Sequence, residues 1–302
     1  MKPIKSLQFQ VEKNKFINHA IEEIPEENLT LATDEIIVKV DLFSFTSNNI
    51  TYAVSGEIIR YWEFFPPVGK QTEGWGVIPV WGFADVVESK ADGIPVGDRI
   101  FGYFPPASHL KMKAGHITGK RFIDVSEHRS TLPPTYNLYR RVLSEPNYDQ
   151  KLDRDRALFY PLYITSFCLW DSLQENNWFG AEQTIILSAS SKTSIGLAYG
   201  LHIDETAPNA IGITSERNLE AVVKLGLYDE VYTYDQLVQI NSTIPTVIVD
   251  MSGNNVVLVD LHKRLGDLMK FTFKVGLTHW KESNPNEGII RERSKFFFAP
   301  SH

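Results

Sequence analysis

The segment that most constrains the fold is Thr184 to Leu201, which reads TIILSASSKTSIGLAYGL. Its apolar run, residues 185–187, is bounded by polar residues and predicts a buried strand. Hydroxyl residues follow, and from Ile195 the sequence is typical of a helix. A strand, a tight turn and a helix start can bind a pyrophosphate, because the helix N-terminus carries free amides and partial positive charge. An ordinary buried strand–helix turn is the competing interpretation.

The turn departs from the dinucleotide fingerprint GxGxxG. Its three glycine positions read Ser191, Thr193 and Gly196. Only the last glycine is kept, which in this motif lets helix and strand pack closely. The two hydroxyl residues can themselves donate to a phosphate. A GxxxxGK[ST] phosphate loop is excluded, because Ile186 and Ser191 occupy both of its glycine positions.

Strands and helices alternate from Glu182 onward, which predicts a parallel α/β sheet. A helix at 155–176 precedes this part. The predicted strands are 184–187, 210–214, 230–232, 246–249, 271–277 and 295–299. The predicted helices are 195–202, 216–225 and 255–265, with a short piece at 234–240.

The first part of the chain, residues 1–125, is rich in β signals. The patterns predict strands at 34–45, 81–89 and 96–104. The aromatic stretch between the first two of these is core, or else the wall of an apolar pocket. Residues 126–153 contain Pro133, Pro134 and Pro146 among polar residues. We interpret them as a long surface connection with at most a short helix at 136–143.

Composition excludes several classes of protein. The net charge of −7, without a Lys/Arg block, argues against nucleic acid or an anionic membrane as partner. The single cysteine, Cys168, excludes an intrachain disulfide and a cysteine-rich zinc site, and it is expected to be a buried hydrophobe. No signal-peptide pattern and no run of about 18 apolar residues is present, so we expect a soluble, cytoplasmic protein.

The order of these pieces resembles a known family. A β-rich first part carries EIIVKV, WGFADVVES and VGDRIFG, and a βα part follows that carries YITSFCLWDSL, LGLYDEVYTYDQL and VIVDMSG. This is similar to the medium-chain dehydrogenase/reductase superfamily, nearest its zinc-free quinone reductases. The resemblance implies a GroES-like β-barrel domain with a long connection at 1–153 and a Rossmann dinucleotide-binding domain at 154–302. It also leads us to expect further residues after His302, because family members usually carry another helical segment there.

The resemblance implies a cleft between the two domains. From the first domain it would be lined by Phe45, Asn48, Tyr61 and Tyr103, with Tyr52 as the proton donor. That Tyr52 is simply a packed aromatic is the alternative. The second domain would contribute cofactor contacts at the turn after strand 184–187, at the ends of strands 210–214 and 246–249, and near the nicotinamide. These residues are Ser190, Ser191, Lys192, Thr193, Ser194, Ile195, Gly196, Asp250, Ser252, Leu277, Thr278 and Phe298. A helix-capping role competes for Asp250.

The end of the second Rossmann strand favours NADP over NAD. NAD enzymes place a carboxylate there to accept from the ribose 2′-hydroxyl. Here the strand ends in Thr214 and Ser215, Glu216 begins the helix, and Arg217 follows. Two hydroxyls and a guanidinium suit a 2′-phosphate. A simple helix-cap role for Ser215 is the alternative.

The sequence therefore predicts a zinc-independent, NADPH-dependent oxidoreductase that transfers hydride to a small apolar carbonyl substrate, quinone-like or enone-like. The alternative is a non-catalytic reductase-fold protein that binds a nucleotide or a small apolar ligand. No metal site is expected, because the cysteine and Gly-His-Glu ligands of the zinc-dependent relatives are missing. We also expect a homodimer joined through the last Rossmann strand, at Phe296 to Phe298.

Overall fold

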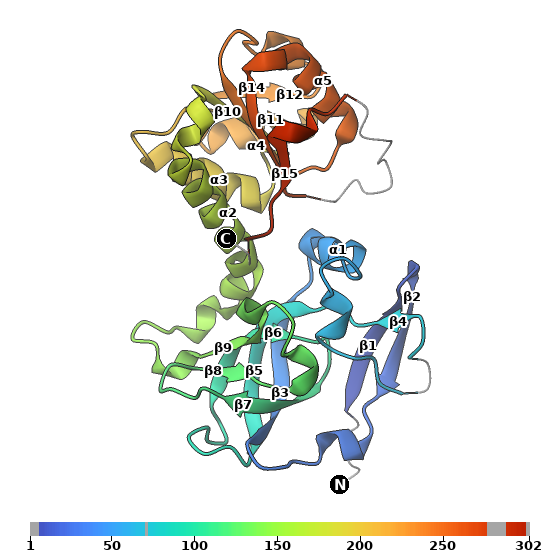
Figure 1. Ribbon diagram of the computed structural model, residues 1–302. Helices are drawn as coiled ribbons and strands as arrows, with labels where there is room; N and C mark the ends of the chain where they lie inside the picture. The colour runs from blue at the N-terminus through green and yellow to red at the C-terminus, as the bar shows by residue number, and fades with distance from the viewer. Residues whose placement is uncertain (1–5, 70–71, 277–287, 300–302) are drawn as a thin grey trace. The chain divides into compact units, whose positions relative to one another are not determined.

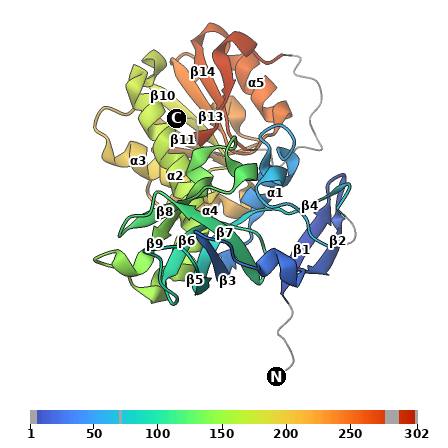
Figure 2. The same cartoon turned by 60° about the horizontal axis from the view of Figure 1, so that its bottom comes forward.

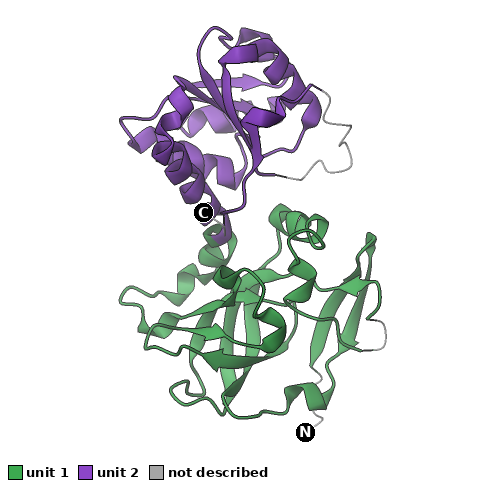
Figure 3. Ribbon diagram, in the orientation of Figure 1, with its two compact units in different colours: residues 1–160 green, residues 161–302 purple. Residues whose placement is uncertain are grey.

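The computed structural model describes residues 6–69, 72–276 and 288–299. It divides into two compact units, residues 1–160 and 161–302 (Figure 3). The division falls within the long helix α2 (Asp153–Glu175), whereas the sequence analysis placed the domain boundary at 153/154.

Unit 1 is built around a closed antiparallel barrel with the strand order β3-β5-β6-β9-β8-β7 (Figure 1). Alternating apolar residues such as Val38, Ile100 and Phe122 fill its interior. Gly102 of the barrel is a close-approach position, because a Cβ there would lie 2.4 Å from the ring of Tyr139. The barrel strands are β3 (Glu35–Ser44), β5 (Val80–Ser89), β6 (Arg99–Phe104), β7 (His109–Gly115), β8 (Arg121–Asp124) and β9 (Leu138–Arg141).

A second, three-stranded sheet in unit 1 has the order β2-β1-β4. Its strands are β1 (Leu7–Glu12), β2 (Lys15–Glu23) and β4 (Trp75–Gly76). Helix α1 (Ser47–Val54) follows β3 directly. It begins with a capping box, in which Thr46 accepts from the helix backbone and the side chain of Asn49 accepts from the Thr46 amide.

Unit 2 holds a parallel six-stranded sheet with the order β12-β11-β10-β13-β14-β15 (Figures 1 and 2). Ile186 packs with residues of α2 and α3 on one face, and its neighbours Ile185 and Leu187 pack with α5 on the other. The strands are β10 (Gln183–Leu187), β11 (Asn209–Thr214), β12 (Glu230–Thr233), β13 (Thr246–Asp250), β14 (Met269–Lys274) and β15 (Ser294–Phe296). The helices are α3 (Lys192–Ile203), α4 (Glu216–Lys224) and α5 (Asn255–Leu265).

A barrel followed by a parallel sheet with helices confirms the predicted fold class. One interpretation was wrong: residues 126–153 are not merely a surface connection. The predicted helix at 136–143 is replaced by a 3-10 turn and by β9, which pairs with both β6 and β8. Arg129 in this segment is 1% exposed and donates to Asp124 and to the Tyr136 carbonyl. The segment is part of the barrel because closure needs this strand.

Within the described ranges, no helix combines the length and the hydropathy that crossing a membrane needs.

Candidate functional site

The turn between β10 and α3 is tight without the usual glycines. Ser188 takes a left-handed conformation with φ 60°, and the Ser191 amide donates to the Ser188 carbonyl at 2.8 Å. Ser191 itself has φ −71° and ψ 149°, a conformation that any residue adopts. The first glycine of the fingerprint is therefore not needed here, because Ser188 makes the bend.

Three of the predicted cofactor contacts, Ser191, Ser194 and Ile195, make hydrogen bonds that hold the start of the helix. The Ser191 hydroxyl accepts from the Ser194 amide at 3.1 Å and donates to the Ser194 hydroxyl at 2.8 Å. Ser194 is fully buried. Ile195 donates its amide to the Ser191 carbonyl, the first hydrogen bond of the helix. These three residues stabilise the N-terminus of α3, as N-cap residues do.

The donors that remain at this helix start belong to neighbouring residues. Among the described residues, the amides of Lys192 and Thr193 have no hydrogen-bond partner, as expected in a first helical turn. The Lys192 side chain is exposed and Thr193 is half-buried. The Ser190 hydroxyl accepts from Asn218 Nδ2 at 3.0 Å, so its own hydrogen is available to a ligand. This donor set suits an anion.

Gly196 is a close-approach position, but the partner differs from the prediction. A Cβ on Gly196 would lie 2.6 Å from Ser166 Oγ, which belongs to α2. The Ser166 hydroxyl donates to the Thr193 carbonyl at 2.8 Å. The glycine therefore lets α3 pack against α2, rather than against the strand as the fingerprint led us to expect.

Three side chains that the sequence analysis missed hold the turn in place. Asn218 of α4 bonds Ser190, the Tyr234 hydroxyl accepts from the Ser188 amide at 3.1 Å, and the Tyr228 hydroxyl donates to the Ala189 carbonyl at 2.8 Å. Burial raises the pKa of both tyrosines. The sequence signal for the two tyrosines was the run LGLYDEVYTYDQL, which contains both. A buried tyrosine usually places its hydroxyl against a hydrogen-bond partner, so such a run indicates polar contacts as well as packing.

Asp250 lies at the end of β13, level with Leu187 at the end of β10. Its Oδ1 accepts from the amide and hydroxyl of Ser252 and from the Gly253 amide, at 2.7–3.0 Å. Its buried Oδ2 has no partner among the described residues, and burial raises the pKa of the carboxyl. Asp250 thus holds a turn and is not a helix cap; Asn254 caps α5.

The end of β11 carries a second buried polar atom that lacks a partner. Thr214 is 1% exposed, and its Oγ1 makes no hydrogen bond within the described residues. Ser215 occupies the N-cap position of α4, but its side chain makes no cap hydrogen bond, so the simple cap interpretation is wrong. Arg217 is exposed in the first turn of α4.

The predicted nicotinamide contacts are less fully described. Leu277 and Thr278 lie outside the described residues. Phe298 is half-buried and follows the last strand, β15.

Four of the five predicted residues of the first domain come together in unit 1. Tyr52 of α1 is 6% exposed, and its ring centroid lies 4.7 Å from that of Tyr61 and 5.6 Å from that of Tyr103. The Tyr52 hydroxyl accepts from Trp81 Nε1 at 3.1 Å, and it also bonds Asn48. Burial raises the pKa of Tyr52 to about 12, which keeps its phenol protonated at neutral pH.

The same cluster contains Tyr136, from the segment that we had interpreted as a surface connection. Its hydroxyl lies 2.8 Å from that of Tyr61. Tyr103 is fully buried, its hydroxyl has no partner among the described residues, and burial raises its pKa well above the ordinary value. The fifth predicted residue, Phe45, is 54% exposed and lines a separate apolar groove.

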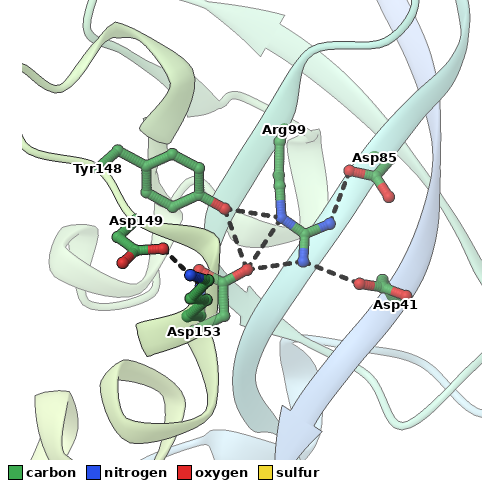
Figure 4. Close-up of polar contacts among 7 residues, drawn as sticks. Asp41, Asp85, Arg99, Tyr148, Asp149 and Asp153 are labelled. Carbon is green, nitrogen blue, oxygen red and sulfur yellow. Dashed lines mark hydrogen bonds and ion pairs between the residues drawn. The ribbon is translucent and has the colours of Figure 1, made fainter.

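The VGDRIFG segment has a structural role in unit 1. Arg99 is 6% exposed and donates to Asp41 of β3, Asp85 of β5 and Asp153 of α2, each at 2.8 Å (Figure 4). Tyr148 also donates to Asp153, at 3.0 Å. Arg99 therefore joins three barrel strands to the first turn of α2.

Candidate metal ligands were also sought. Over residues 6–69, 72–276 and 288–299, no three His, Cys, Asp or Glu side chains are grouped so that they could hold a metal ion.

Solved structures with this organisation were then compared. CurA from Vibrio vulnificus shares 15% identity with a TM-score of 0.59, over 97% of this chain and 82% of that one. The Etr1p/NADP/crotonyl-CoA complex shares 13% with a TM-score of 0.57, over 99% and 83%. A putative NADPH:quinone reductase from Bacillus thuringiensis shares 12% with a TM-score of 0.54, over 98% and 80%. The fold is that of the medium-chain dehydrogenase/reductase superfamily, so the resemblance is confirmed at the level of the fold.

Comparisons of sequence, unlike those of structure, identify one family of proteins. No curated protein matches the chain. One family model matches residues 43–302, which span both units. The chain therefore belongs to the family described as "Protein of unknown function (DUF2855)".

Proposed function

We propose that the protein is a zinc-independent reductase that binds NADPH in unit 2 and transfers hydride to a small apolar carbonyl substrate, quinone-like or enone-like. The observation that carries the proposal is the donor set at the start of α3, which lies at the carboxyl ends of parallel strands. Ligands of open α/β sheets bind at such ends. Two structural neighbours are described as an NADP complex and an NADPH:quinone reductase, which supports the choice of cofactor.

The turn fits a pyrophosphate on physical grounds. The amides of Lys192 and Thr193, the Ser190 hydroxyl and the Lys192 ammonium are available donors, and the bend does not depend on the lost glycines. The partnerless polar atoms of Thr214 and Asp250 stand at the ends of the strands on either side of β10. Buried polar groups normally have partners, so these two indicate a polar ligand.

Tyr52 is the residue proposed to hold the substrate proton. The hydride would come from bound NADPH, whose chemistry is the cofactor's own. Trp81 donates to the Tyr52 hydroxyl oxygen, so the phenolic hydrogen is not used in that bond. Because burial raises its pKa to about 12, the group stays protonated across the physiological range. Tyr52→Phe should therefore retain NADPH binding and lose turnover.

The cofactor choice is tested by titrating the protein with NADPH and NADH and following energy transfer from its tryptophans. One charge-assisted contact from Arg217 to a 2′-phosphate contributes roughly 1.5–3 kcal/mol, or about tenfold to a hundredfold in affinity. We expect NADPH to bind at least about tenfold more tightly than NADH. Arg217→Ala should remove most of that ratio and leave NADH affinity nearly unchanged.

Lys224→Ala is the matched control, because Lys224 is an exposed cation in the last turn of the same helix. It should leave the ratio unchanged. Equal affinity of the unmodified protein for the two cofactors would contradict the assignment. Turnover is then measured with a quinone and enone panel, as loss of reduced nicotinamide.

Zinc independence is tested separately. Because thiolate ligands are absent from the chain apart from Cys168, purified protein should carry no stoichiometric zinc, and a chelator should leave its melting temperature unchanged. One zinc per chain by elemental analysis would overturn this part of the proposal.

A non-catalytic binding protein is the second candidate. It is favoured by the turn itself, in which Ser191 replaces the first fingerprint glycine and pairs with Ser194 to cap the helix. Nucleotide binding without turnover of any tested quinone or enone would support this candidate, as would binding of neither cofactor.

A further inference from the structure

Unit 1 carries an apolar groove that the reductase proposal does not use. Four separate segments form it: strands β1 and β2, the end of β3, and residues 106–108. Its volume is about 410 Å³, which is in the range of small-molecule sites. It is lined by Leu7, Phe9, Ile21, Phe43, Phe45, Pro106, Ala107 and Ser108.

At this end of β1 the usual burial pattern of a strand, with apolar side chains inside and polar side chains outside, is inverted. Gln8 and Gln10 are 5% and 0% exposed, whereas Leu7 on the groove side is 39% exposed. Gln10 donates to the Val68 carbonyl at 2.7 Å, and Gln8 accepts from the Val68 amide at 3.0 Å. At this end of β1 both glutamines are thus buried, whereas Leu7 is exposed and Phe9 is half-buried; further along the strand Val11 is buried, at 3% exposed. Such an inversion is costly for a surface that stays in water and marks a binding surface.

Other apolar side chains of the groove are exposed as well. Ile21 is 65% exposed, and Phe43 is 40% exposed. At one side the ring of Phe9 stacks on His19, with 5.7 Å between centroids. Several large apolar side chains that converge on one concavity differ from the scattered apolar residues of an ordinary surface.

The groove offers no polar handle to a ligand. Among the described residues, Ser108 is the only polar one that lines the groove, and its hydroxyl accepts from the Leu7 amide at 2.8 Å. No charged side chain of the described ranges lines the groove. A ligand that carried a charge or several hydrogen-bonding groups into the groove would lose hydration without compensation.

The size of the groove favours a small molecule over a protein partner. Eight residues line it, whereas a stable protein interface uses roughly 20–30 residues a side. We propose that this groove binds an uncharged apolar small molecule, or the hydrocarbon portion of one. The inference does not rest on the proposed reductase function, because the groove contains neither Tyr52 nor any of the proposed nucleotide-binding residues; Phe45 is the one lining residue that was predicted for the substrate cleft.

The test uses the full chain and the uncharged fluorophore N-phenyl-1-naphthylamine, titrated without nucleotide. We expect saturable binding of one probe per chain. Ile21→Lys, which puts a charge into the groove, should weaken binding at least about tenfold. Ile17→Lys is the matched control, because Ile17 lies on the same strand, is 76% exposed and does not line the groove. It should bind the probe as the unmodified protein does.

Leu7→Ser provides a second variant, with a smaller loss expected, and circular dichroism verifies the fold of each protein. Non-saturable binding, or equal affinity of Ile21→Lys and the unmodified chain, would overturn the proposal. Sedimentation tests whether a second copy of the chain occupies the groove instead. In that case the unmodified chain would be a dimer that does not bind the probe, and Ile21→Lys would be a monomer. This result would also show the proposal to be wrong.

Discussion

At the residue scale, α3 and α2 approach so closely that the size of a side chain at their contact decides which substitutions the fold tolerates. Gly196 faces Ser166, and Gly200 faces Trp170, where a Cβ would lie 3.2 Å from the ring. The Ser166 hydroxyl is not free to move aside, because it bonds the carbonyls of Leu162 and Thr193. A methyl group at position 196 must therefore displace a bonded side chain.

Gly196→Ala should destabilise the protein despite the better helix propensity of alanine. Overpacking costs about 1–3 kcal/mol, and the propensity gain in a helix is about 1 kcal/mol, so a net loss of roughly 1 kcal/mol is expected. Urea unfolding measures it. Adding Ser166→Ala should recover part of the loss. Gly119→Ala is the control, since a Cβ there meets no atom within 4 Å. A more stable Gly196→Ala protein would contradict the argument.

The residues of the candidate sites could be predicted only in part. The position of the turn proposed to bind an anion follows from the local pattern of a strand, hydroxyl residues and a helix. Which hydroxyls remain free does not, because the pairing of Ser191 with Ser194 and the bond from Asn218 depend on side-chain geometry. Tyr136 was missed for a similar reason, since its partner Tyr61 lies 75 residues away in the sequence.

At the scale of elements, the parallel sheet was predictable and the barrel was only partly so. Each βα unit of the second part is local, and buried parallel strands read as short apolar runs such as TVIVD. Barrel strands pair with partners far away in the sequence. β9 is only four residues long and reads LYRR, so its role comes from closure of the barrel rather than from its own pattern. β7 reads HLKMKAG, and its alternation was a usable signal that we missed.

His262 links three elements of unit 2, and its protonation should weaken them. It lies on α5 and is 1% exposed; its Nε2 bonds Thr272 of β14, and its Nδ1 accepts from the Ile290 amide. Burial, followed by Arg293 and Lys274, lowers its pKa from 6.5 to about 4. The unfolded chain therefore binds a proton first as the pH falls. The contribution of the neutral ring is fully present above about pH 6.5 and is lost towards pH 4.

This loss amounts to roughly 2–3 kcal/mol between pH 6.5 and 4. Chemical denaturation at several pH values measures it. His262→Gln should be less stable at neutral pH and should show a flatter pH dependence over that range. His202→Gln, at an exposed histidine of α3, is the control and should keep the slope of the unmodified protein. An unchanged slope in His262→Gln would exclude this histidine as the cause.

At the scale of the whole molecule, the predicted dimer concerns the edge strand β15 of the parallel sheet. β15 is the last strand in the sheet order and, within the described residues, pairs only with β14. The three phenylalanines that we expected at this edge differ in their surroundings. Phe296 is 41% exposed, Phe297 is 8% exposed with its ring 5.3 Å from that of Phe273, and Phe298 is half-buried. Phe296 is thus the residue best placed for a second subunit.

We predict a homodimer that joins two sheets through β15, because this edge strand ends in the exposed Phe296 and an edge strand offers its backbone groups to a second strand. Phe296→Lys should convert the dimer to a monomer at micromolar concentration with little change in the melting temperature of the monomer unit. Phe297→Ala should act differently: it removes a core ring and costs about 3–5 kcal/mol of stability. Light scattering and thermal unfolding, applied to both variants, separate assembly from folding. A mass of one chain for the unmodified protein would contradict the dimer and would indicate that another part of the same chain covers this edge.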